Sequence, residues 1–194
     1  MRIMEVMSHA TNTIAEGEVL QLLNCHDADT TEQRYMEVVR RKTAKLFEAA
    51  ARLGAILGKQ NEIMEQALAD YGMHLGVAFQ LIDDVLDYTA SPEDTGKNLG
   101  DDLAEGNPTL PLLHAMSRGT PEQATLIRKA IENGGHDNMS AVFAAIESTG
   151  GITYTAQAAQ QEVDQAITAI EPLPPSPYKE ALYSLAEFSV NRAY

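Results

Sequence analysis

The segment NEIMEQALADYGMHLGVAFQLIDDVLDY (residues 61–88) decides the fold class of this chain. Its apolar side chains recur every three or four residues, which is the spacing of one face of an α-helix. They are Ile63, Ala67, Tyr71, Leu75, Ala78, Ile82 and Leu86. So long a face predicts one continuous helix packed against others. Gly72 and Gly76 lie inside it, and small residues on a long helix indicate close approach of a neighbouring helix.

The rest of the chain also has helical spacing, and strand signals are nearly absent. We predict capping boxes at Thr30–Gln33 and Thr120–Gln123 and a polar loop over residues 91–106. The other predicted helices cover residues 1–25, 31–57, 108–116, 120–134, 137–148, 152–170 and 177–192. Tyr35, Val38, Val39, Leu46, Ala50 and Leu53 are the residues of the second helix expected to face inward. The prediction is a single all-α domain over residues 1–194.

Composition limits the function classes. The net charge is −14, with 28 acidic against 14 basic residues, so the surface would repel nucleic acid. The single cysteine, Cys25, excludes an intrachain disulfide and favours a reducing, cytoplasmic compartment. The N-terminal residues lack the apolar core of a signal peptide, and no apolar run is long enough to span a membrane.

Asp83, Asp84 and Asp87 form the motif with the clearest chemistry. Residues 83 and 87 are four apart and lie on one face of a helix. A solvated acidic face is the commoner fate of such a run. Here apolar residues surround the acids, which predicts burial, and a buried carboxylate needs a partner. Mg²⁺ is one such partner, because it takes oxygen ligands and is often held by one or two carboxylates plus substrate phosphates.

Two basic segments suit a diphosphate. Lys42-Thr43 offers a cation and a hydroxyl, and Lys97 lies in the polar loop ten residues after Asp87. Taken alone, Lys97 is better explained as an ordinary loop lysine, and the alternative for Lys42 is an exposed lysine on the helix surface.

Four ordered segments resemble one family. They are IAEGEVLQL (14–22), KTAKLF (42–47), GVAFQLIDDVLDY (76–88) and GKNLGDDLAEGNPTLPLLHAM (96–116). Together they are similar to the second aspartate-rich part of trans-polyprenyl diphosphate synthases, closest to the bacterial long-chain (octaprenyl) branch. The resemblance implies an all-α bundle around a deep cavity, usually a homodimer. It also implies Mg²⁺-dependent condensation of isopentenyl diphosphate with an allylic diphosphate, as in the synthesis of quinone side chains.

The resemblance also implies residue roles. Asp83 would bind Mg²⁺, with Asp84 and Asp87 as further ligands or as partners of its bound waters. The groups that would bind the allylic diphosphate are Lys42, Thr43, Gln80 and Lys97. Phe79 would face the allylic cation, with plain core packing as the alternative. Glu18 and Gln21 would orient the cavity wall. Asp101 would hold Lys97 or a metal-bound water.

The chain departs from the family pattern in two places. It has a single D-D-x-x-D and lacks the arginine pair that follows the family's first motif. We therefore expect a partial bundle without its N-terminal helices, with little or no turnover alone and with apolar surface exposed along residues 1–25 and 61–88. Asn107 stands where the family usually has lysine, and it is predicted to cap a helix starting at Pro108. The alternatives are a non-catalytic or regulatory subunit that pairs with a complete synthase and, more weakly, a class I terpene cyclase.

Overall fold

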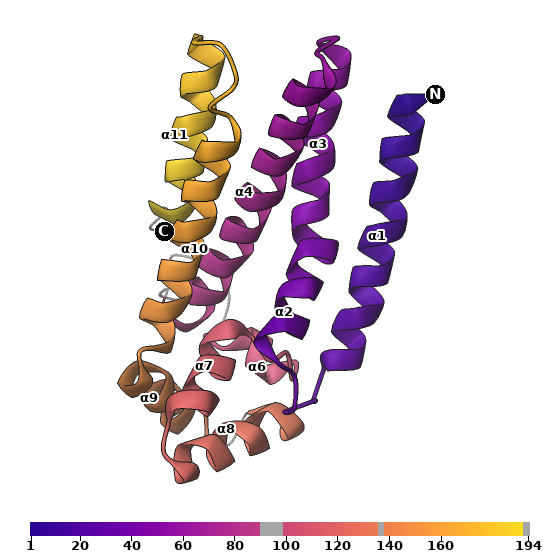
Figure 1. Ribbon diagram of the computed structural model, residues 1–194. Helices are drawn as coiled ribbons and strands as arrows, with labels where there is room; N and C mark the ends of the chain where they lie inside the picture. Colours follow the sequence, from indigo (N-terminus) through magenta and orange to yellow (C-terminus); the bar gives the residue numbers. More distant parts are fainter. Residues whose placement is uncertain (90–98, 136–137, 192–194) are drawn as a thin grey trace. The chain divides into compact units, whose positions relative to one another are not determined.

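The computed structural model describes residues 1–89, 99–135 and 138–191, and all regular secondary structure within them is helical (Figure 1). This confirms the predicted all-α class. The elements are α1 (Arg2–Asn24), α2 (Glu32–Val39), η1 (Arg40–Ala44), α3 (Lys45–Leu57), α4 (Glu62–Thr89), α6 (Asp101–Ala104), α7 (Leu110–Arg118), α8 (Pro121–Asn133), α9 (Met139–Thr149), α10 (Gly151–Ala169) and α11 (Pro177–Asn191). No helix in the described ranges combines the length and apolarity that crossing a bilayer requires.

Contacts divide the chain into two compact units, each built from segments that are distant in sequence. The first contains residues 1–18, residues 38–80 and the C-terminal helices from residue 158 onward. The second contains residues 19–37 and 81–157. Helix α4 passes from the first unit to the second after Gln80, so the predicted site residues are distributed over both.

In the first unit, the apolar face of α4 packs against α10 and α11. The buried core residues are Tyr71, Leu75, Ala78, Val163, Ala166, Ile170 and Ala186. The Tyr71 hydroxyl donates to the Leu182 carbonyl at 2.8 Å, which ties α4 to α11. The predicted helical face is therefore confirmed, except that Ile63 at its start is 68% exposed.

The two glycines of α4 mark the close helix contact that the sequence predicts. A Cβ added to Gly76 would lie 2.5 Å from the Ala44 Cα, and one added to Gly72 would lie 2.5 Å from the Phe47 carbonyl oxygen. Both distances are shorter than any real side chain tolerates, so glycine is required where η1 and α3 pass over α4.

In the second unit, α7, α8 and α9 pack on one another (Figure 1). Their buried residues include Leu112, Ile127, Ile131, Val142 and Ile146. The end of α4 joins this core through Tyr88, whose ring meets Phe143 edge-on with centroids 5.6 Å apart. This contact anchors the part of α4 that carries the aspartates.

Of the three helix caps predicted from the sequence, one is confirmed and two are wrong. The capping box at Thr120 and Gln123 is confirmed. The one at Thr30 is wrong by one residue, because α2 begins at Glu32 and the Thr31 hydroxyl accepts the Arg34 N–H at 3.2 Å. The predicted Asn107 cap is also wrong, since α7 begins at Leu110 and its N-cap residue is Thr109.

Two segments differ from their predicted structure. The predicted helix over residues 31–57 is continuous but contains the π-helical turn η1. The polar loop predicted over residues 91–106 contains the short helix α6, while residues 90–98 lie outside the described part.

Exposed apolar residues are concentrated on α1. Met4, Val19, Leu22 and Leu23 are all more than half exposed. The expected apolar surface is therefore present along residues 1–25, whereas the expectation for residues 61–88 is wrong because that face is largely buried beyond Ile63. Two residues predicted to face inward on the next helix, Leu46 and Ala50, are also exposed.

Candidate functional site

The D-D-x-x-D carboxylates lie on α4 in the second unit, and none of them is a fully solvated side chain. Asp84 is only 1% exposed, while Asp83 and Asp87 are half-buried. This burial argues against the interpretation that Asp83, Asp84 and Asp87 form a solvated acidic face. The three carboxylates must instead find partners.

Tyr35 is a hydrogen-bond partner of Asp84. The hydroxyl of Tyr35, which comes from α2, donates a hydrogen bond to the Asp84 Oδ2. Tyr35 is itself buried, and burial together with the neighbouring carboxylate raises the pKa of its hydroxyl well above the ordinary value. The phenol therefore stays neutral and acts as a donor that stabilises the buried carboxylate.

Asp87 is less well satisfied. Its Oδ2 is buried and has no hydrogen-bond partner among the described residues. Burial, followed by the Asp102 carboxylate, raises the pKa of Asp87 from 3.8 to about 7. The Gly100 N–H donates to the Asp87 carbonyl at 2.9 Å, which brings the start of α6 to this end of α4. A buried, unsatisfied carboxylate oxygen beside further carboxylates is a place where a cation would be stabilised.

The carboxylates fit part of a metal site and not a complete one. Within the described residues, no group of three or more His, Cys, Asp or Glu side chains is arranged to hold a metal by itself. Mg²⁺ commonly needs fewer protein ligands, since phosphate oxygens and waters complete its octahedron. Asp83 and Asp87 match that requirement in type and in helical spacing.

The Lys42-Thr43 pair lies in the first unit, within the π-helical turn η1. The Thr43 hydroxyl donates to the Gln80 Oε1 at 2.9 Å, so the structure brings two predicted diphosphate-binding groups together. The Lys42 ammonium lies 3.0 Å from the Glu18 Oε2. An ammonium has three donor hydrogens, so a phosphate would either share Lys42 with Glu18 or displace it. π-Helical turns occur frequently at functional sites.

The close contact between α1 and η1 explains the E-G-E segment. A Cβ on Gly17 would lie 2.6 Å from the Lys42 backbone nitrogen, so only glycine fits there. On either side of it, Glu16 contacts Arg41 at 2.8 Å and Glu18 contacts Lys42. Sequence reasoning missed this arrangement, although two acids flanking a glycine and two adjacent cations on another helix are a readable signal.

The remaining predicted residues have other surroundings. Phe79 packs against Phe47 with ring centroids 5.4 Å apart, a contact that is compatible with core packing and with the role facing the allylic cation. Gln21 Nε2 donates to the Asn107 Oδ1 at 3.2 Å, so Gln21 supports the segment before α7. Lys97 lies outside the described residues.

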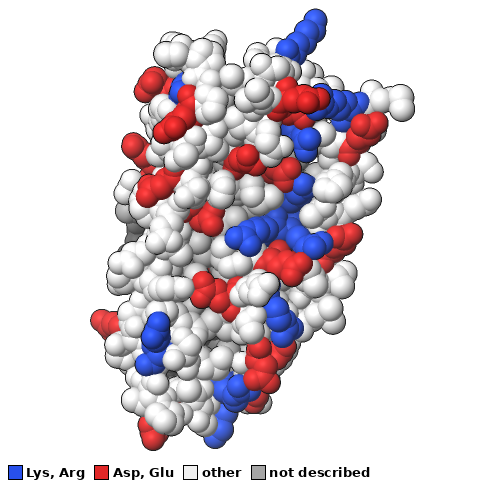
Figure 2. Space-filling view, in the orientation of Figure 1, with Lys and Arg blue, Asp and Glu red and all other residues white. Residues whose placement is uncertain are grey.

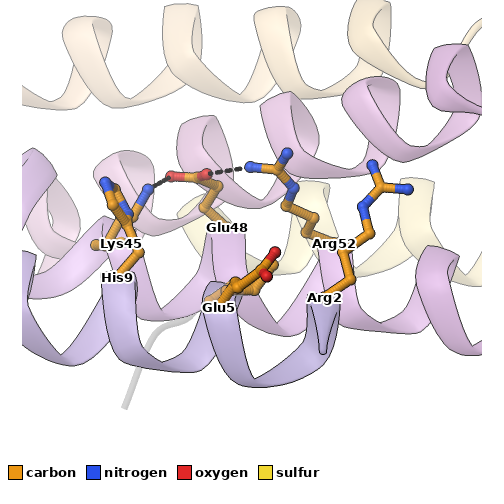
Figure 3. Close-up of a pocket in the computed structure, with 8 residues that line it drawn as sticks. Arg2, Glu5, His9, Lys45, Glu48 and Arg52 are labelled. Carbon is orange, nitrogen blue, oxygen red and sulfur yellow. Dashed lines mark hydrogen bonds and ion pairs between the residues drawn. The ribbon is translucent and has the colours of Figure 1, made fainter.

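The first unit also contains a cavity of about 210 Å³ (Figure 3). Charged side chains from α1 and α3 line it, and they are largely paired: Glu48 contacts Lys45 at 2.6 Å and Arg52 at 3.9 Å. The buried Glu65 beside it accepts from Arg2 and Arg52 at 2.7 and 2.9 Å. None of the predicted site residues lines this cavity.

Figure 2 shows acidic side chains spread over the visible face, with basic side chains next to many of them. The ion pairs described above follow the same pattern. Because acidic residues outnumber basic ones, the chain keeps a net charge of −14 despite this local pairing.

Comparison with known proteins gives a consistent result. A family profile described as polyprenyl synthetase matches residues 1–148. The octaprenyl diphosphate synthase of Escherichia coli (strain K12) is 54% identical over 193 residues, which are 99% of this chain and 60% of that protein. The chain thus spans about 60% of the length of the curated relatives it matches.

Two solved structures share the fold. A polyprenyl synthase from Caulobacter crescentus CB15, complexed with calcium and isoprenyl diphosphate, has a TM-score of 0.93 at 40% identity, covering 99% of this chain and 59% of that one. A geranylgeranyl pyrophosphate synthase from Corynebacterium glutamicum, complexed with isoprenyl diphosphate and magnesium, has a TM-score of 0.91 at 27% identity, covering 99% of this chain and 56% of that one.

Proposed function

This chain belongs to the polyprenyl synthetase family, and from that premise we propose that it carries the second aspartate-rich part of a Mg²⁺-dependent prenyltransferase. The reaction is condensation of isopentenyl diphosphate with an allylic prenyl diphosphate. The product class is a long-chain isoprenoid, such as the side chain of a quinone. The identity with an octaprenyl diphosphate synthase supports the long-chain assignment.

The observation that carries the proposal is the environment of Asp87. A buried carboxylate oxygen without a hydrogen-bond partner among the described residues, next to Asp83 on the same helix, is an incomplete site for a hard cation. We propose Asp83 as the Mg²⁺ ligand, with Asp84 and Asp87 acting as further ligands or through metal-bound water. Two relatives solved with isoprenyl diphosphate also contain calcium or magnesium, which supports a divalent cation here.

The other side chains act on the diphosphate. Lys42 and Lys97 would supply positive charge, while Thr43 and Gln80 would orient phosphate oxygens by hydrogen bonding. Bound Mg²⁺ would neutralise negative charge that develops on the leaving diphosphate when the allylic C–O bond breaks. Preorganised charges of this kind usually give the largest single contribution to catalysis. Phe79, packed on Phe47, would offer a ring face to the allylic cation.

We further propose that the chain alone has little or no turnover, because residues 1–194 contain a single D-D-x-x-D. The test is a radiometric assay with an allylic diphosphate, labelled isopentenyl diphosphate and Mg²⁺. The chain is assayed alone and after fusion behind the 40% of the Escherichia coli relative that it does not cover. The fusion is expected to form long-chain product, and Asp83→Ala in the fusion is expected to abolish it.

Two outcomes would contradict this proposal. Robust polyprenyl product from the chain alone would refute the requirement for a second motif. A fusion that folds but is inactive, or one in which Asp83→Ala keeps full activity, would refute the assigned chemistry.

The second candidate is a non-catalytic subunit that binds a complete synthase, and the exposed apolar residues of α1 favour it. It predicts that the chain changes the rate of a complete synthase while Asp83→Ala in the chain has no effect. The homodimer and the cytoplasmic compartment remain predictions from the sequence.

A further inference from the structure

We propose that Tyr35 is a positioning residue of the D-D-x-x-D motif: its hydroxyl holds Asp84 in the core of the second unit and thereby sets the direction in which Asp83 and Asp87 leave α4. The inference rests on the proposed function, because it concerns the metal affinity of that motif. It replaces the ligand role proposed above for Asp84 with that of an anchor, and it leaves Asp83 and Asp87 as the metal-binding carboxylates.

The contact itself is entirely within the second unit. Tyr35 and Asp84 come from different helices, α2 and α4, and are 7% and 1% exposed. The Tyr35 hydroxyl donates to the Asp84 Oδ2. The carboxylate oxygen that accepts this bond is therefore directed toward α2, and its lack of solvent exposure separates Asp84 from half-buried Asp83 and Asp87.

Helix geometry links this anchor to the other two carboxylates. Successive residues of an α-helix are about 100° apart, so Asp83 lies about 100° to one side of Asp84. Asp87 lies about 60° to the same side, which leaves Asp83 and Asp87 about 40° apart. Any rotation of α4 that releases Asp84 from Tyr35 moves both of them together.

Loss of the hydroxyl would leave the buried Asp84 carboxyl with one hydrogen-bond partner fewer. A buried carboxylate relieves such a loss by moving toward water, and on α4 that movement is a rotation or shift of the motif. The orientation of Asp83 and Asp87 would then no longer be held, so metal affinity would fall even though neither ligand has changed.

The test compares Tyr35→Phe with Tyr88→Phe. Tyr88 is a matched control, because its hydroxyl is also buried in the second unit but bonds to the Thr109 hydroxyl at 3.1 Å and not to a carboxylate. Mn²⁺ serves as the probe, and its dissociation constant for the chain is measured by water-proton relaxation. We expect Tyr35→Phe to weaken Mn²⁺ binding about tenfold and Tyr88→Phe to stay within about twofold.

A second pair of variants does not depend on Tyr35→Phe folding well. Asp84→Asn and Asp84→Ala both remove the charge, but only Asp84→Asn keeps an oxygen that accepts the Tyr35 hydroxyl. We expect Asp84→Asn to bind Mn²⁺ more tightly than Asp84→Ala, by about fivefold or more. Circular dichroism on each variant verifies that the helices are retained.

The outcomes separate this inference from the proposed function. If Asp83→Asn weakens Mn²⁺ binding while Tyr35→Phe leaves it unchanged, or if Asp84→Asn and Asp84→Ala bind equally, the role of Tyr35 is refuted and the metal site stands. If the unaltered chain does not bind Mn²⁺, or if Asp83→Asn leaves its binding unchanged, both are refuted.

Discussion

The sharpest stability prediction concerns Gly76, where α4 meets η1. A Cβ at this position would lie 2.5 Å from the Ala44 Cα, whereas ordinary van der Waals contact begins at 3.4 Å. The obstacle is backbone, which no side-chain rotation relieves. Gly76→Ala must therefore move η1 away from α4 by roughly the difference, which also separates Thr43 from Gln80.

The magnitude follows from two opposing effects. Overpacking at a close contact costs about 1–3 kcal/mol, and a backbone obstacle places Gly76→Ala at the upper end. Alanine gains about 1 kcal/mol over glycine in a helix interior. The expected net destabilisation is therefore about 2 kcal/mol. Gly54→Ala in α3 is the matched control, because nothing lies within 4 Å of its added Cβ. It should gain the helix term alone, about 1 kcal/mol.

Urea denaturation followed by circular dichroism at 222 nm measures both variants in the same buffer. The expected difference in unfolding free energy between them is about 3 kcal/mol. If Gly76→Ala is as stable as Gly54→Ala, then η1 and α4 are not in the tight contact described here.

Three further predictions concern charge and exposed surface. Asp87 has a pKa of about 7 in the folded chain against an ordinary 3.8, so ionisation of Asp87 destabilises the fold. This free-energy cost is absent below pH 3.8, grows between pH 3.8 and pH 7, and is complete above pH 7. In metal-free buffer Asp87→Asn should therefore stabilise the chain by about 1–2 kcal/mol at pH 8, a figure reduced from the full pKa shift because Asp87 is partly exposed to solvent. The stabilisation should be smaller at pH 5, and urea titrations at both pH values would measure it. Arg52→Met should destabilise more than Glu65→Gln in thermal melts, because it leaves a carboxylate with 3% exposure short of one cation. The exposed Leu22 and Leu23 should drive self-association, which light scattering would detect and which Leu22→Glu with Leu23→Glu should reduce.

Each of these has a clear contrary result. A gain for Asp87→Asn that grows as the pH falls would reverse the assigned cause of the pKa shift. Equal melting temperatures for Arg52→Met and Glu65→Gln would mean that the buried carboxylate does not depend on Arg52. A dilute chain that scatters as a monomer would leave the α1 surface without the expected effect.

Periodicity was sufficient to predict the fold class and the long helix α4, because a packed helix needs an apolar face along its whole length. It was also sufficient to predict the close approach at Gly72 and Gly76. Local patterns gave wrong predictions near two helix ends. Ile63 has the helical spacing but lies beyond the packed region, and Thr30 matches a capping pattern that the chain uses one residue later.

The candidate site was predicted in its residue types and not in its pairings. The spacing of Asp83 and Asp87 is a local property of one helix, so it can be read from sequence. The partners of Asp84 and Lys42, which are Tyr35 and Glu18, come from other helices, and nothing in the local pattern selects them. The π-turn was also missed, because the apolar spacing around Lys42 is compatible with an unbroken α-helix.

That π-turn has a consequence for how the chain tolerates change in length. A turn with i→i+5 bonding holds one residue more than its α-helical equivalent, so Arg40–Ala44 behaves as a single-residue insertion absorbed within an otherwise continuous rod. Deleting one residue there would restore α-helical bonding and leave the flanking segments facing the same directions, because the deleted residue is the one that the wider turn accommodates. Tyr35 before the turn and Lys45, Glu48 and Arg52 after it would keep their present faces. What the deletion would change is the wide turn that holds Lys42 and Thr43, so the number of residues in Arg40–Ala44 constrains these two side chains and not the helical segments that flank them.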